Sequence, residues 1–133
     1  MNKSIFTKVK ETYQHLGVPV SGKPILPNKN DYDFRVRFIF EELNELDTAN
    51  DLDDIVSMAD ALADLVIVIY GLAATMGLPF DEILTAVNTS NYNGRKLVET
   101  YEESKRGYEY DLIKTEKFIE PKDIINVLLK RLR

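Results

Sequence analysis

The sequence predicts a single all-α domain: a helical bundle with an acidic antiparallel helix hairpin, and an irregular C-terminal tail that ends in a short helix. Three observations favour this fold class. Apolar side chains recur at helical spacing in the first 46 residues. Residues 51–78 contain no proline. A chain of 133 residues also has the usual length of one domain.

The first two helices are predicted from the N-terminal third of the chain. Residues 3–16 repeat apolar side chains every three to four positions, and Gly17 can stop this helix. Pro24 and Pro27 keep the following loop extended to about residue 30. Asn30 or Asp31 can then cap a second helix. Its apolar residues at helical spacing are Phe34, Phe38, Leu43 and Leu46.

A turn and a long third helix are expected next. Residues 47–51 have turn chemistry, and the third helix begins near residues 51–54 and ends before Pro79. Its apolar run Leu65–Met76 has 12 residues, fewer than the ~20 that span a bilayer. We therefore expect a helix buried in a bundle core or at a subunit interface, no membrane partner, and a cytoplasmic location.

The C-terminal half is predicted from its prolines and glycines. A fourth helix is expected from Pro79 to about Ser90. Residues 91–118 show no clear period and are interpreted as a loop with a short hairpin. Pro121 then opens a last helix over residues 124–132.

The composition excludes several kinds of site. The chain has no cysteine and one histidine, His15, so disulfides, thiolate metal sites and multi-histidine zinc sites are excluded. Its net charge of −5 argues against nucleic acid as a partner. The acidic surplus calls for a solvated surface or a hard metal ion.

Two carboxylate pairs point to such an ion. Glu42 and Glu45 lie on one face of the second helix, and Asp60 and Asp64 on one face of the third. In an antiparallel hairpin, residues at equal height have numbers with a constant sum. Glu45 with Asp60, and Glu42 with Asp64, agree on this sum to within one and place the turn near residue 53.

Four carboxylates at one level repel each other unless a cation lies between them. A merely solvated acidic surface is the alternative, but Asp60 and Asp64 stand in an apolar helix, where unpaired acids are rare. The all-oxygen donor set favours Mg²⁺, or Mn²⁺, over zinc. Bound ions of this kind would grip a polyphosphate and activate a water.

At these residues the chain resembles the all-α nucleoside triphosphate pyrophosphatases of the MazG-like superfamily, which includes phosphoribosyl-ATP pyrophosphohydrolases and dimeric dUTPases. Their pattern is EExxE followed by ExxD. Asp64 matches the closing Asp, whereas Ala61 stands where the pattern has Glu, so that Asp60 would supply the missing carboxylate. A phosphoribosyl-ATP-pyrophosphohydrolase-like branch is also similar at residues 15–24, 60–71, 90–91 and 120–124. The first motif is matched by Glu41, Glu42 and Glu45.

The resemblance implies a Mg²⁺-dependent pyrophosphohydrolase that converts a nucleoside triphosphate to its monophosphate and pyrophosphate. We expect the substrate to be a deoxynucleotide. Glu41 would orient or deprotonate the attacking water, or bind a further ion. Metal ligands would be Glu42, Glu45, Asp60 and Asp64. Substrate contacts would come from Asn91, Arg95, Lys96 and His15.

The resemblance also implies a homodimer or homotetramer, with the apolar third helix packed across subunits. Two alternatives remain open. One is a dUTPase-like diphosphatase. The other is a metal-stabilised helical dimer that binds nucleotides or a protein without turnover, which the departure at Ala61 would favour.

Overall fold

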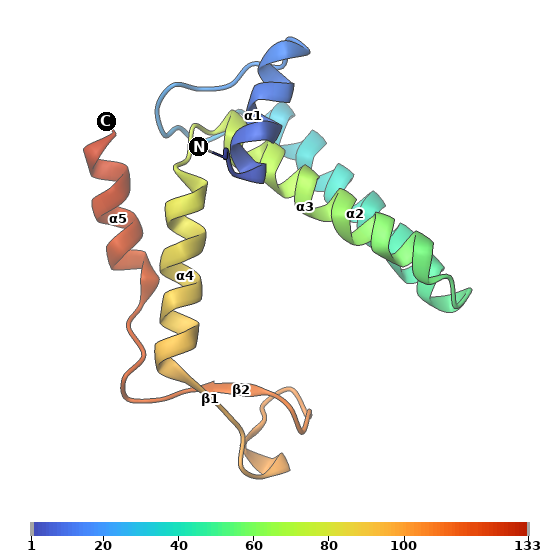
Figure 1. The fold of residues 1–133 in the computed structure, drawn as a ribbon, viewed down its shortest axis with the longest axis vertical. Helices are drawn as coiled ribbons and strands as arrows, with labels where there is room; N and C mark the ends of the chain where they lie inside the picture. Colours follow the sequence, from blue (N-terminus) through green and yellow to red (C-terminus); the bar gives the residue numbers. More distant parts are fainter. Residues whose placement is uncertain (1, 133) are drawn as a thin grey trace. The chain divides into compact units, whose positions relative to one another are not determined.

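The computed structural model describes residues 2–132 and confirms the all-α fold class (Figure 1). Positions 1 and 133 of the predicted domain lie outside the described residues. The chain divides into two compact units, residues 2–80 and 81–132, each described here by itself. The elements are α1 (Ile5–His15), α2 (Lys29–Asp51), α3 (Ile55–Thr75), α4 (Phe80–Gly94), β1 (Arg95–Leu97), η1 (Tyr101–Glu103), β2 (Leu112–Lys114) and α5 (Pro121–Arg131).

Helices α2 and α3 form the predicted antiparallel hairpin, and Figure 1 shows them side by side. Asn28, not Asn30 or Asp31, caps α2, because its side chain accepts a hydrogen bond from the Asp31 backbone N–H at 2.9 Å. The predicted turn at residues 47–51 was also wrong. Helix α2 continues to Asp51, since Ala49, 4% exposed, is buried in the hairpin.

The turn falls at residues 52–53, as the carboxylate register predicted. Asp53 adopts a positive φ of 52°. Asp54 then caps α3, accepting hydrogen bonds from the N–H and the hydroxyl of Ser57 at 3.1 and 2.6 Å. These bonds hold the pKa of Asp54 below its usual value. The turn therefore fixes the level at which side chains of α2 and α3 meet.

Helix α1 packs on the C-terminal half of α3. Phe6, Ala73 and Ala74 form a buried cluster with Tyr70 and Phe80 against it. The ring centroid of Phe6 lies 5.6 Å from that of Tyr70 and 5.6 Å from that of Phe80. This contact is the main core of the unit formed by residues 2–80.

The loop from α1 to α2 is fastened to the end of α3. The N–H of Ile25 donates to the carbonyl of Met76 at 2.9 Å. Gly77 follows with a φ of +67°, and an added Cβ would lie 2.3 Å from the carbonyl oxygen of Lys23. Only glycine combines this conformation with this close backbone approach.

The substitution Gly77→Ala is therefore expected to lower the free energy of unfolding by about 2–3 kcal/mol, combining backbone strain with overpacking. Gly22→Ala is the matched control, because a Cβ at Gly22 meets nothing within 4 Å. Urea unfolding followed by circular dichroism measures both. Equal stability of the two variants would contradict the packing described here.

The second unit contains the predicted hairpin and last helix. Strands β1 and β2 pair antiparallel with Arg95 opposite Lys114. The loop between them is braced by Asp111, which accepts from the Ser104 hydroxyl at 2.8 Å and from Arg106 at 2.5 Å. The hydrogen bond from Arg106, with that from Ser104, lowers the pKa of Asp111.

Helix α4 extends beyond the predicted end near Ser90 to Gly94. The backbone N–H and hydroxyl of Thr115 donate to the Gly94 carbonyl at 2.8 and 2.9 Å. An added Cβ at Gly94 would lie 2.4 Å from the Cα of Phe118. The returning chain thus caps the helix with partners more than 20 residues away in sequence.

Helix α3 is more apolar than its 12-residue run suggested. The helix has 21 residues, and an 18-residue window within it reaches a mean hydropathy of 2.0, which by length and composition alone would suffice to cross a membrane. The core helix of a soluble protein passes the same test, and one such helix is weak support for a span. In this structure the helix also carries Asp60 and Asp64.

Candidate metal and substrate site

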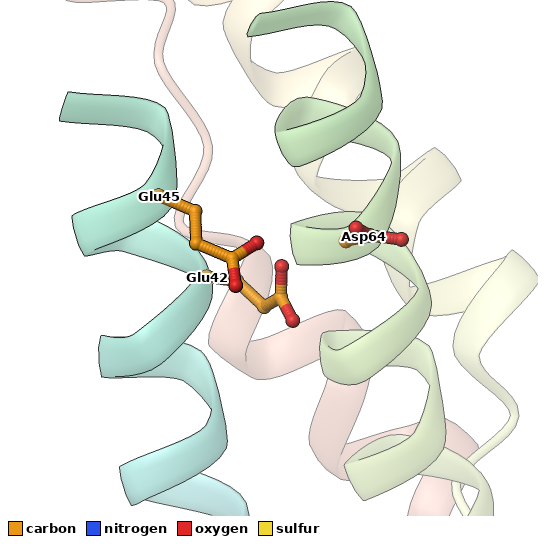
Figure 2. Close-up of side chains that lie close together, drawn as sticks. All are labelled: Glu42, Glu45 and Asp64. Carbon is orange, nitrogen blue, oxygen red and sulfur yellow. The ribbon is translucent and has the colours of Figure 1, made fainter. Parts of the chain in front are cut away.

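Three carboxylates converge between α2 and α3. Carboxylate oxygens of Glu42, Glu45 and Asp64 all lie within 4.8 Å of one another. Figure 2 shows both glutamates reaching from α2 toward α3, which carries Asp64. The pairing of Glu42 with Asp64 across the hairpin is one of the two that the helix register predicted, and the other was Glu45 with Asp60.

Glu42 is the buried member of this group. It is 8% exposed, and its Oε2 has no hydrogen-bond partner among the residues that the structure describes. Burial, together with the charges of Glu45 and Asp64, raises the pKa of Glu42 from 4.5 to about 7. A buried acceptor without a donor, flanked by two further acids, is costly in the absence of a cation. The oxygen-only donor set therefore fits a hard divalent ion.

Asp60 and Ala61 occupy different surroundings. Asp60 lies outside the three-carboxylate group and lines an adjoining pocket of about 380 Å³ together with Glu45, Asp54 and Ser57. Ala61 is 2% exposed and leaves no carboxylate at the position where the resembled pattern has one. The expected cluster of four carboxylates is thus three carboxylates with Asp60 beside them.

Glu41 is exposed and also lies outside the group. It lines a separate pocket of about 330 Å³ with Phe34, Arg37 and Phe38. The sequence analysis placed both phenylalanines in the apolar set of the second helix. The spacing that joins them to Glu41, three to four residues, was visible in the sequence.

The predicted phosphate-binding residues were expected in a loop after the fourth helix. They lie instead on a helix and a strand. Asn91 lies within α4, and its side chain accepts a hydrogen bond from Arg95 Nε at 2.9 Å. Arg95 and Lys96 lie on β1. The guanidinium of Arg95 stacks 5.0 Å from the ring centroid of Phe118, and Lys96 pairs with Glu99 at 3.5 Å.

These three residues belong to the second unit, whereas the carboxylate group belongs to the first. His15 ends α1 and is exposed. The geometry of the first unit alone, three convergent carboxylates with an unpartnered buried oxygen, is suited to binding a divalent cation and through it a polyphosphate.

Comparison with known proteins identifies the family. No significant match was found among curated proteins. Residues 9–91, which include α2, α3 and the whole carboxylate group, match the family of phosphoribosyl-ATP pyrophosphohydrolases. A match over more than half of the chain, on the helices that hold the converging acids, establishes the relationship. This chain belongs to the phosphoribosyl-ATP pyrophosphohydrolase family.

Proposed function

We propose that the chain is a metal-dependent nucleoside triphosphate pyrophosphohydrolase. Water attacks the α-phosphorus, the bond to the β-phosphate oxygen breaks, and a nucleoside monophosphate and pyrophosphate are released. The family supports a pyrophosphohydrolase. The observation that carries the proposal is the convergence of Glu42, Glu45 and Asp64 around an unpartnered buried oxygen. We also propose a cytoplasmic location, which suits a nucleotide substrate.

The three carboxylates would hold Mg²⁺, or Mn²⁺, and Asp60 lies close enough to Glu45 to line the same pocket. When bound, such an ion supplies charge neutralisation for the phosphates and lowers the pKa of a bound water. The chain's own contribution is positioning. Glu42 is fixed by burial, while Glu45 and Asp64 remain accessible from solvent.

The predicted contacts of Arg95 and Lys96 with the phosphate tail stay predictions. Arg95 is held in one orientation by Asn91 and by the Phe118 ring, so its remaining N–H groups are preorganised. Lys114 lies opposite Arg95 on the paired strand and 4.6 Å from the same ring. Lys96 follows Arg95 on β1. His15 remains a candidate contact of the nucleoside.

Release of pyrophosphate from a panel of nucleoside and deoxynucleoside triphosphates, with Mg²⁺ or Mn²⁺, tests the proposal. We expect monophosphate and pyrophosphate in equal amounts, and no turnover in the presence of EDTA. Turnover of dUTP alone would support the dUTPase-like alternative. Nucleotide binding without any turnover would overturn the enzyme and favour a binding protein.

We also propose a homodimer, or a dimer of dimers, formed through the side of the hairpin away from the carboxylates. The large apolar side chains there are solvent-exposed by 41–52% in one chain. Two of them, Leu43 and Leu62, line a pocket of about 580 Å³. Exposed apolar patches of this kind mark protein interfaces. The residues that define this apolar side are Leu43, Leu62, Val66 and Ile69.

Leu62→Lys is expected to weaken self-association at least about 100-fold, because an ammonium group would be desolvated in the interface. Val56→Lys is the matched control. Val56 is 76% exposed and does not line the apolar pocket. Sedimentation velocity would then detect the 15.3 kDa monomer for the first variant. A wild-type protein that is already monomeric would contradict this interface.

A further inference from the structure

A second pocket lies on the same side of α2 as the carboxylate group. Its lining residues are spaced at three and four positions, so that they share one face of the helix. Glu45 continues the row, four residues after Glu41. All of them lie in the unit of residues 2–80. The base-side pocket is defined by Phe34, Arg37, Phe38 and Glu41.

The aromatic wall of the base-side pocket is held in place from behind. The rings of Phe34 and Phe38 meet edge to face, with centroids 5.8 Å apart. The guanidinium of Arg35 lies 5.6 Å from the Phe34 centroid. Arg35 itself is buried and donates to the Tyr13 hydroxyl at 3.2 Å.

Phe34 is nevertheless 51% exposed. A fixed aromatic ring with an exposed surface is a platform on which a nucleobase can stack. The site therefore offers stacking without the entropic cost of ordering a mobile ring.

The polar groups of the pocket are open to a ligand. Arg37 and Glu41 are four residues apart, a spacing at which opposite charges often pair, yet the described part of the chain shows no ion pair between them. Arg37 uses its Nε to donate to the Asp33 carbonyl at 3.3 Å. Its terminal nitrogens and the carboxylate of Glu41 thus present a donor array and an acceptor pair to the same pocket.

We infer that this pocket binds the guanine base of the substrate, an inference that rests on the proposed function. The N1–H and 2-amino groups of guanine are adjacent donors that one carboxylate can accept, whereas O6 and N7 are acceptors that suit an arginine. Adenine would turn the lone pair of N1 toward Glu41. Uracil and thymine each offer a single N–H between two carbonyl groups. Among these bases guanine alone combines two adjacent donors for the carboxylate of Glu41 with two adjacent acceptors, O6 and N7, for Arg37.

The distances along the helix agree with this placement. Seven residues separate Phe38 from Glu45, which corresponds to about 10 Å of helix. A base at Phe38, with its ribose and α-phosphate laid along α2, would bring the phosphate to the carboxylate group. In this arrangement Glu41 selects the base, and is not a residue that activates the water.

Binding of uncharged nucleosides without metal separates base recognition from catalysis. We would measure the affinities of deoxyguanosine, deoxyinosine, deoxyadenosine and deoxyuridine in EDTA by ligand-observed NMR. Deoxyguanosine is expected to bind about 10- to 100-fold more tightly than deoxyadenosine, and more tightly than deoxyinosine, which lacks the 2-amino group. In Mg²⁺, kcat/KM for dGTP should exceed that for dATP by a similar factor.

Two variants distinguish the roles within the pocket. Glu41→Gln should remove the preference for guanine. Phe34→Ala should instead weaken the binding of all purine nucleosides about 10-fold without changing the ratio of their affinities. Phe40→Ala is the matched control, because Phe40 is 59% exposed and does not line the pocket. Thermal unfolding of each variant confirms that it is folded.

Equal binding of the two purines, tighter binding of deoxyuridine, or an unchanged preference in Glu41→Gln would overturn the inference. So would a Glu41→Gln variant that loses turnover equally with every nucleotide, since this indicates a role at the water. Absence of turnover with intact guanine-selective binding would contradict the proposed function only.

Discussion

Asp64→Asn is expected to reduce kcat/KM for pyrophosphate release about 1000-fold, equivalent to about 4 kcal/mol of transition-state stabilisation. Asp64 is the member of the carboxylate group that comes from α3, so its loss leaves Glu42 and Glu45 without the opposing ligand. An amide binds a divalent cation more weakly than a carboxylate, because it carries no charge. The initial rate with Mg²⁺ in excess measures this change.

Two further variants make the Asp64 result specific. Asp60→Asn should reduce activity by no more than about 10-fold, as expected for a supporting position, because Asp60 lies outside the three-carboxylate group. Asp51→Asn is the control, an exposed acid at the end of α2. Circular dichroism should show that all three retain their helices. Retained activity in a folded Asp64→Asn variant would remove Asp64 from the site.

The hairpin and its register could be predicted because both follow from periodic constraints. Helical spacing places Glu42 with Glu45 and Asp60 with Asp64, and antiparallel pairing then fixes the turn. The local turn prediction at residues 47–51 was wrong for a tertiary reason. Burial of Ala49 in the hairpin keeps the helix continuous through residues that would favour a turn in isolation.

The end of α4 and the base-side pocket could not be predicted from the sequence, for two different reasons. Thr115, whose hydrogen bond to Gly94 accounts for the end of the helix, lies 21 residues further along the chain. No local sequence pattern predicts a contact over this separation. Phe34 and Phe38, in contrast, were visible at helical spacing. The pattern of apolar residues alone does not distinguish a core face from an exposed aromatic wall, and the 51% exposure of Phe34 is a property of the packed structure.

The pH dependence of stability in the metal-free protein should have the opposite sign from that of metal binding. The pKa of Glu42 rises from 4.5 to about 7 on folding, chiefly because the group is buried. Between these values the folded state holds a proton that the unfolded state has released. Stability therefore decreases as the pH rises through this range and levels off above it. The loss is no more than about 3 kcal/mol.

Glu42→Gln tests this balance because it removes the charge and keeps the shape. In EDTA near pH 8 the variant should melt several degrees above the wild type, whereas below about pH 4, where Glu42 is protonated in both states, the two should be similar. With Mg²⁺ the order should reverse, because the ion binds only the deprotonated carboxylate. A variant that is less stable than the wild type in EDTA near pH 8 would contradict this account. It would show that Glu42 has a stabilising partner and that its charge is compensated without a cation.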